Sequence, residues 1–174
     1  MIFANPHPVT IEIGPGKGET LIHRARTERE RNFFAIERSH ALARSIDNRL
    51  HELDLRNARA IAGDATCILA LLPDACVAGY LIQFPDPWWK RRHKRRRLLT
   101  PPFVAEMRRT LVLHGEIELV TDVQEYFDLA QCHLEANEGL ESVTREISTD
   151  VSTDFARKAV RYGATIRRSV HRRR

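Results

Sequence analysis

The sequence has few cysteines and no long apolar run. Its three cysteines, Cys67, Cys76 and Cys132, form no C-x-x-C pair and have no histidine at zinc-like spacing. We therefore expect buried, unpaired thiols and no metal site. No apolar stretch approaches the roughly 20 residues that a membrane helix needs, so a membrane-spanning protein is not expected. Residues 1–8 contain neither a basic leader nor an apolar signal segment, and we expect a cytoplasmic protein.

Positive charge is abundant and unevenly distributed. The 174 residues, which we expect to form a single domain, carry a net charge of +5. The excess lies in two runs, Lys90 to Arg97 and Arg167 to Arg174. Clustered positive charge indicates a polyanionic partner such as a nucleic acid. We expect the last few arginines to be disordered, and the sequence does not distinguish a monomer from a homodimer.

Short strand-like runs alternate with longer segments of helical spacing, which is typical of a parallel sheet covered by helices on both faces. We expect a doubly wound α/β fold with a mostly parallel, seven-stranded sheet. The predicted strands are Val9 to Ile13, Asn32 to Glu37, Ala58 to Ala62, Val77 to Phe84, Glu116 to Thr121, and a hairpin-like pair at Leu140 to Ile147 and Ala164 to Arg172. The predicted helices are Glu19 to Arg29, Ser39 (the N-cap) to about Asp54, Thr66 to Leu72, Thr100 to about Leu113, and Gln124 to Asn137.

Residues 85–99 interrupt the alternation of strand-like and helix-like segments. They contain two prolines, two tryptophans and eight consecutive basic or histidine residues, Lys90 to Arg97. We expect an exposed loop that contacts the phosphates of a nucleic acid.

A nucleotide site is predicted at the ends of the first three strands. The glycines at 14, 16 and 18 follow the first strand and let the backbone approach a ligand at the carboxyl edge of the sheet. Glu37 ends the second strand, where a carboxylate can accept hydrogen bonds from both hydroxyls of a ribose. Asp64, together with the backbone N–H of Ala65, can read the amino edge of adenine. These residues predict a cofactor that contains adenosine.

The spacing of the glycines distinguishes a dinucleotide cofactor from the cofactor of methyltransferases. A dinucleotide fingerprint has its third glycine five residues after the first, and this chain has Glu19 there, which disfavours an NAD(P)-dependent oxidoreductase. Gly14, Gly16 and Gly18 match instead the G-x-G-x-G turn of methyltransferases, whose ligand has an amino-acid tail and no phosphate. Glu12 can face the cationic amino group or sulfonium of that ligand. S-adenosylmethionine is the predicted cofactor.

The fourth strand leads into Phe84-Pro85-Asp86-Pro87-Trp88. The prolines make the turn rigid, and Asp86 can accept hydrogen bonds from the N1–H and N2–H donors of guanine. Trp88 or Trp89 can pack against a base. Asp86 is the candidate catalytic residue.

Together these segments resemble the bacterial tRNA (guanine-N7-)-methyltransferase family, whose members carry a similar E-I-G-x-G-K-G, I-E, G-D-A and F-P-D-P-W with a basic run after it. The resemblance runs from Val9 to about Tyr126 and more loosely to the end. It implies the Rossmann-like fold of class I S-adenosylmethionine-dependent methyltransferases. It also implies methyl transfer to N7 of a guanine in the variable loop of tRNA, at position 46.

The resemblance also implies roles for individual residues. Glu12, Glu37 and Asp64 would contact S-adenosylmethionine beside the glycine turn and Ala65, and Asp86 would be the active-site acid. Lys90 and Asp122 would contact the substrate. Further candidate substrate-binding residues are Arg92, His93, Arg95 and Arg96 in the basic run, and Thr153, Asp154 and Phe155 in a late segment.

One position departs from the family pattern. The late T-K-F-E of relatives is Thr153-Asp154-Phe155-Ala156 here, so the glutamate that helps to hold guanine is an alanine. Either Asp154 takes over that role or guanine binding is weaker. The change keeps open a second reading, a non-catalytic RNA-binding protein with a methyltransferase fold.

Overall fold

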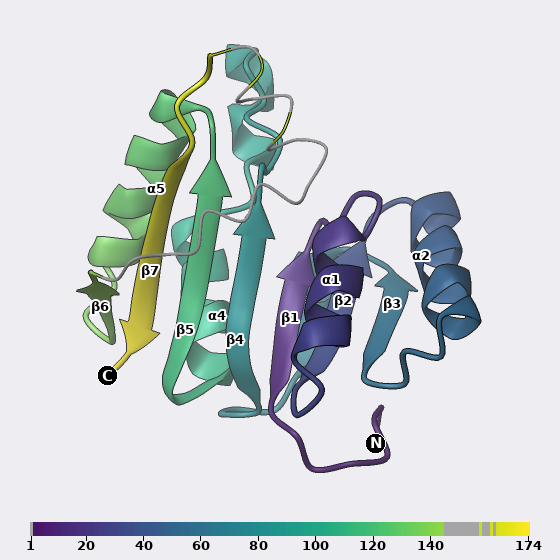
Figure 1. The fold of residues 1–174 in the computed structure, drawn as a ribbon. Coiled ribbons are helices and arrows are strands. Elements are labelled where there is room, and N and C mark those ends of the chain that lie inside the picture. Colours follow the sequence, from purple (N-terminus) through teal and green to yellow (C-terminus); the bar gives the residue numbers. More distant parts are fainter. Residues whose placement is uncertain (1, 145–156, 158–160, 162) are drawn as a thin grey trace.

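A computed structural model of the chain describes residues 2–144, 157, 161 and 163–174 (Figure 1). A seven-stranded sheet has the order β3-β2-β1-β4-β5-β7-β6. Strands β1 to β5 pair in parallel, and β7 is antiparallel to both β5 and β6. The strands are β1 (Val9–Ile13), β2 (Asn32–Glu37), β3 (Ala58–Ala62), β4 (Val77–Gln83), β5 (Leu111–Thr121), β6 (Leu140–Val143) and β7 (Arg167–Arg173). The mostly parallel sheet and the late hairpin-like pair expected from the sequence are confirmed.

Helices cover both faces of the sheet (Figure 1). On one face α1 (Glu19–Thr27) and α2 (His40–Glu52) bury the apolar side chains of β2 and β3. On the other face α3 (Ala65–Leu71), α4 (Pro101–Thr110) and α5 (Gln124–Glu135) pack on a larger core that extends from β2 to β5. Parallel strands that are buried on both faces need near-continuous apolar runs, which is why β2 and β4 were recognisable from the sequence. Within the described residues, no helix has both the length and the apolar character to cross a membrane.

The clearest difference from the predicted elements is at the start of β5. The expected helix continues to Leu113, but α4 ends at Thr110 and β5 begins at Leu111. The hydroxyl of Thr110 donates within its own helix to the carbonyl of Glu106 and contacts the hydroxyl of Tyr80 at 2.5 Å. This contact ends the helix against β4, and a register shift at the start of the β4/β5 pair absorbs the extra strand residues.

The prediction of buried cysteines is wrong. Cys67, Cys76 and Cys132 are all exposed. Two of them lie on α3 and α5, where the inward positions are occupied by residues such as Leu69 and Leu134. The 3.6-residue period of the helix therefore places both cysteines on the solvent side.

The prediction of a disordered arginine tail is also wrong. Arg167–Arg173 form β7, and the last arginines have protein partners. Arg172 pairs with Glu116 at 2.9 Å, Arg173 donates to the carbonyl of Leu111, and Arg174 lies 3.8 Å from a carboxylate oxygen of Glu141. Much of the charge in this run is therefore used inside the protein.

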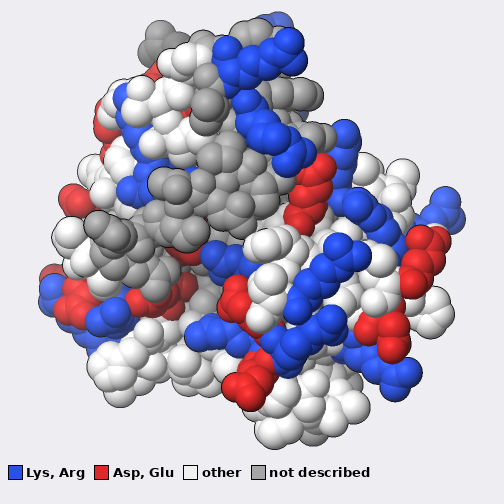
Figure 2. All heavy atoms as spheres, viewed as in Figure 1, with Lys and Arg blue, Asp and Glu red and all other residues white. Residues whose placement is uncertain are grey.

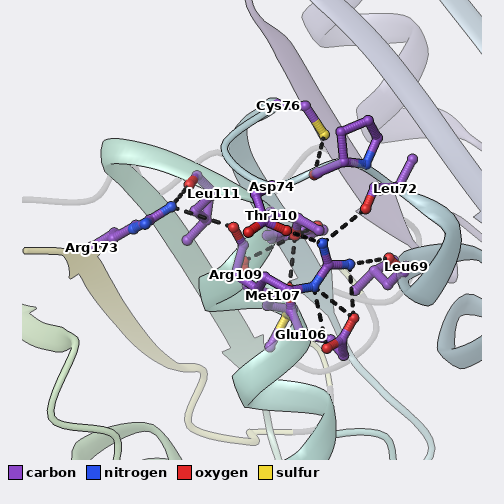
Figure 3. A network of polar contacts seen from close by, with 12 residues as sticks. Leu69, Leu72, Asp74, Cys76, Glu106, Met107, Arg109, Thr110, Leu111 and Arg173 are labelled. Atoms are coloured by element: carbon purple, nitrogen blue, oxygen red, sulfur yellow. Dashed lines mark hydrogen bonds and ion pairs between the residues drawn. The ribbon is translucent and has the colours of Figure 1, made fainter.

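Arg109 connects several elements at the edge of the sheet where β4 begins (Figure 3). Its guanidinium donates to the carbonyls of Leu69 and Leu72, at the end of α3, at 3.0 and 2.9 Å. The same group pairs with Glu106 on α4 and with Asp74 in the turn before β4. A cation suits the carbonyl end of a helix, and this one holds α3, α4 and the beginning of β4 together.

His171 on β7 predicts a stability that depends on pH. The side chain is 1% exposed, and neither ring nitrogen has a hydrogen-bond partner in the described part of the chain. Burial lowers the pKa of His171 below its usual 6.5, against the opposing effect of Glu135. The unfolded chain therefore binds a proton that the folded chain does not, and the free energy of unfolding falls as the pH drops below about 6.5.

We predict that His171→Leu removes this acid-dependent loss. In urea unfolding, the stability of the variant relative to the unsubstituted protein increases as the pH is lowered from about 7.5 to about 5.5. His51→Leu, at an exposed position on α2, serves as the control. A difference between H171L and the unsubstituted protein that stays constant with pH would contradict this role for His171.

Candidate active site

A cleft of about 790 Å³ lies at the carboxyl ends of β1 to β4, the upper edge of the sheet in Figure 1. Its walls come from the glycine turn, from the residues that follow β2, β3 and β4, and from the basic segment beyond. The predicted site residues that line it are Gly14, Glu37, Asp64, Ala65, Asp86 and Arg96. Residues more than 80 positions apart in sequence thus meet at one edge of the sheet, as expected for an open parallel sheet.

Each of the three acids in this cleft is held by a backbone N–H two residues further on. The N–H of Ser39 donates to Glu37 at 2.9 Å, and the N–H of Thr66 donates to Asp64 at 2.8 Å. The N–H of Trp88 donates to Asp86 at 3.1 Å. In each case one carboxylate oxygen accepts the bond, and a carboxylate has further lone pairs for a ligand.

The glycine turn needs backbone angles that other residues adopt only with strain. Gly14, Gly16 and Gly18 have φ values of 69°, 57° and 72°. Gly14 lines the cleft, whereas Gly16 and Gly18 do not. A Cβ added at Gly18 would lie 2.9 Å from a methyl group of Ile46 on α2. Gly18 therefore serves the packing of α1, and a cofactor contact at Gly16 or Gly18 stays a prediction.

Glu12 lies away from the cleft wall. Its side chain is 5% exposed and sits on the face of the sheet that α1 covers, near Glu118 and Arg24, which form an ion pair at 3.1 Å. Burial raises the pKa of Glu12 from 4.5 to about 7; Arg24 lowers it and Glu118 raises it further. The contact of Glu12 with a cofactor stays a prediction.

The sequence predicted an exposed loop over residues 85–99, but this prediction is only partly correct. The segment contains the 3₁₀-helix η1 (Arg91–Arg96). A 3₁₀-helix has three residues per turn, so positions i and i+3 share a face. His93 and Arg96 are such a pair, and both contact Trp88: the His93 ring meets it edge-on with centroids 5.7 Å apart, and the Arg96 guanidinium lies 5.1 Å from the ring centroid. Trp88 thereby holds η1 against the cleft.

Arg97 is a structural residue that the sequence analysis missed. It ends the basic run but is only 6% exposed. Its Nε donates to the carbonyl of Pro87 at 2.9 Å, and its Nη2 donates to Glu125 on α5 at 3.0 Å. The guanidinium also lies 5.8 Å from the ring centroid of Tyr126. No local sequence signal marks Arg97, because its burial depends on Pro87, Glu125 and Tyr126 from other parts of the chain.

The other predicted substrate residues are less closely grouped. Lys90 and Arg92 are exposed at η1, and Asp122 is exposed after β5 without lining the cleft. Figure 2 shows Lys and Arg side chains at the end of the molecule where η1 lies. The side chain of Arg95 and the residues Thr153, Asp154, Phe155 and Ala156 lie outside the described part of the chain.

Glu12 gives a prediction with a definite sign. The folded state holds a proton on Glu12 more tightly than the unfolded state. The contribution of Glu12 to the free energy of unfolding is therefore fully present below about pH 4.5 and is lost as the pH rises through about 7. The pKa difference corresponds to about 3 kcal/mol. We predict that Glu12→Gln gains about that much stability relative to the unsubstituted protein between about pH 4.5 and pH 8.

The measurement is urea unfolding of the ligand-free protein across that pH range. Glu52→Gln, at an exposed position on α2, is the matched control and shows a much smaller change. A pH-independent difference for Glu12→Gln would show that Glu12 is already ionised in the folded protein at acid pH.

Arg97→Ala tests the link between the Asp86 turn and α5. Hydrogen bonds to charged groups contribute about 1.5–3 kcal/mol each, so we predict a loss on the order of 2 kcal/mol in the free energy of unfolding. Arg92→Ala, which removes an exposed arginine from the same run, should change it by less than about 0.5 kcal/mol. Equal effects of the two substitutions in urea unfolding would show that Arg97 does not anchor the turn.

Comparison with a solved structure supports the fold. The chain superposes on an S-adenosylmethionine (SAM) dependent methyltransferase from Aquifex aeolicus with a TM-score of 0.67, covering 96% of this chain and 82% of that one. The two sequences are only 14% identical, so the likeness concerns the fold alone. It confirms the Rossmann-like architecture of class I methyltransferases expected from the motifs.

Sequence comparisons are closer. The profile of a family described as "Putative methyltransferase" matches residues 6–171. A tRNA (guanine-N(7)-)-methyltransferase from Rhodopirellula baltica is 33% identical, with 99% of this chain covering 69% of that protein. The corresponding protein from Thiobacillus denitrificans is 35% identical, with 99% of this chain covering 78% of it. Both relatives are longer than this chain. The chain belongs to this methyltransferase family, together with the bacterial tRNA (guanine-N7-)-methyltransferases that its motifs resemble.

Proposed function

We propose that the protein transfers a methyl group from S-adenosylmethionine to N7 of a guanine in tRNA, at position 46 of the variable loop. The observation that carries the proposal is the convergence of Glu37, Asp64 and Asp86 in one cleft that is bordered by the basic helix η1. The names and identities of the two relatives support the same reaction.

The cleft has the groups that this cofactor requires. Glu37 and Asp64 both line the cleft, where Glu37 would accept hydrogen bonds from the ribose hydroxyls and Asp64 one from the adenine amino group. Gly14 has no Cβ, which lets the ligand approach the backbone at the end of β1. The bound cofactor supplies an electrophilic methyl group on a sulfonium.

Methyl transfer to guanine N7 depends on alignment of the two substrates more than on acid–base catalysis. Guanine N7 has a lone pair and no proton in the neutral base, so no general base is required at that atom. Asp86 would accept hydrogen bonds from N1–H and N2–H and so orient the purine. Its negative charge also favours the cation that forms on the ring. Its turn is held by the Trp88 N–H and by Arg97, so little reorganisation is needed.

The RNA partner follows from the cations beside the cleft. The exposed Lys90 and Arg92 are suited to phosphate contacts, which make affinity depend steeply on salt. Residues 85–99 would then combine two tasks, lining the cleft and gripping tRNA. A single catalytic domain and a cytoplasmic location belong to the same proposal.

The test uses the whole chain, cofactor labelled in its methyl group and unmodified tRNA. We expect transfer of label and, after sodium borohydride and aniline treatment, cleavage at one guanine of the variable loop. Label without cleavage would place the methyl group on another atom. Binding of tRNA without transfer would favour the non-catalytic RNA-binding protein that Ala156 keeps open. A rise in melting temperature with S-adenosylhomocysteine but not with NADH would exclude the oxidoreductase.

Asp86→Ala separates chemistry from cofactor binding. Loss of the group that orients guanine and stabilises its charge should lower kcat on the order of 100-fold or more, with the dissociation constant of S-adenosylmethionine changed by less than about 3-fold. Asp128→Ala, an exposed carboxylate on α5, is the matched control and retains activity. An unchanged kcat in the Asp86 variant would remove this residue from the reaction.

A further inference from the structure

The two tryptophans of this chain are adjacent in sequence but have different surroundings. Trp88 lines the cleft and is half-buried, with Arg96 over its ring and the His93 ring nearly perpendicular to it. Trp89 does not line the cleft and is 66% exposed. Trp88 is therefore engaged in holding η1, whereas Trp89 offers most of its surface to a partner.

The surroundings of Trp89 distinguish it from an ordinary exposed apolar residue. Single exposed apolar side chains are common and by themselves mean little. In the described part of the chain the other large ones are aliphatic: Ile2, Leu42, Ile61, Leu71 and Leu113. Trp89 alone is aromatic, and it stands between the turn of Asp86 and the exposed cations Lys90 and Arg92.

An exposed aromatic ring beside cations is suited to unpaired nucleotides, because the ring stacks on a base while the cations contact the backbone phosphates. The target guanine has its own place in the cleft, at Asp86. A ring that lies outside the cleft three residues further on is placed to meet the next nucleotide along the strand.

Resting on the proposed function, we propose that Trp89 is a stacking platform for an unpaired base next to the target guanine. Stacking there would keep the flanking nucleotide out of the RNA fold and hold the guanine at the cleft mouth. Trp89 would thus contribute to substrate binding and not to the methyl transfer itself.

The first test measures tRNA binding and turnover. Loss of one stacked base corresponds to about 5-fold or more in affinity, so Trp89→Ala should raise the KM and Kd for unmodified tRNA by at least about 5-fold. Trp89→Phe keeps an aromatic ring and should stay within about 3-fold of the unsubstituted protein. The Kd of S-adenosylmethionine is expected to be the same in all three proteins.

Salt dependence separates stacking from charge. Trp89→Ala should leave the slope of log Kd against log salt concentration unchanged, because it removes no phosphate contact. Arg92→Ala, the matched control three residues away, should reduce that slope by about 1. A slope that falls equally in both variants would mean that Trp89 acts only by placing the cations, which would overturn the proposal.

Fluorescence gives a readout that does not depend on turnover. Trp88 and Trp89 are the only tryptophans, so a change on adding tRNA that is seen in the unsubstituted protein and absent in Trp89→Phe reports on Trp89. If the protein methylates tRNA while Trp89→Ala keeps its KM, the stacking proposal fails and the proposed function stands. If tRNA binding depends on Trp89 but no methyl group is transferred, the proposed function fails, and Trp89 is a stacking platform for an unpaired base without a target guanine beside it.

Discussion

At the ends of β2, β3 and β4, a carboxylate accepts a hydrogen bond from the backbone N–H two residues further along the chain. The same arrangement recurs after β5, where the hydroxyl of Thr121 accepts from the N–H of Val123. Each bond satisfies an N–H that has left the sheet ladder and fixes the side chain that accepts it. The acids of the cleft are thus oriented before a ligand arrives, which reduces the entropy lost on binding.

The segment after β4 divides one run of positive charge between two roles. Arg96 and Arg97 hold η1 to Trp88, to Pro87 and to α5. Lys90 and Arg92 are exposed and available to a partner. Within η1 the three-residue period puts His93 and Arg96 on the face that contacts Trp88, whereas Arg92 lies on another face. The turn of Asp86 is consequently supported by the same segment that presents charge to RNA.

Much of the fold and of the site could be predicted from local patterns. Apolar runs located the parallel strands, and the residues just after them became the cleft, because parallel strands bring their carboxyl ends to one edge. The errors came from contacts across the chain. The start of β5 depends on the contact between Thr110 and Tyr80, and the arginines of β7 are ordered by partners such as Glu116 and Leu111.

The amino-acid sequence by itself determined the order of strands and helices, the glycine turn and the acids at the strand ends, since these follow from apolar period and from turn chemistry. The burial of Arg97 and of Glu12 was decided only by the tertiary structure. The tertiary structure also decided that Trp89 is exposed and Trp88 is half-buried. Burial depends on what packs against a side chain from distant elements, and no local pattern of residue types contains that information.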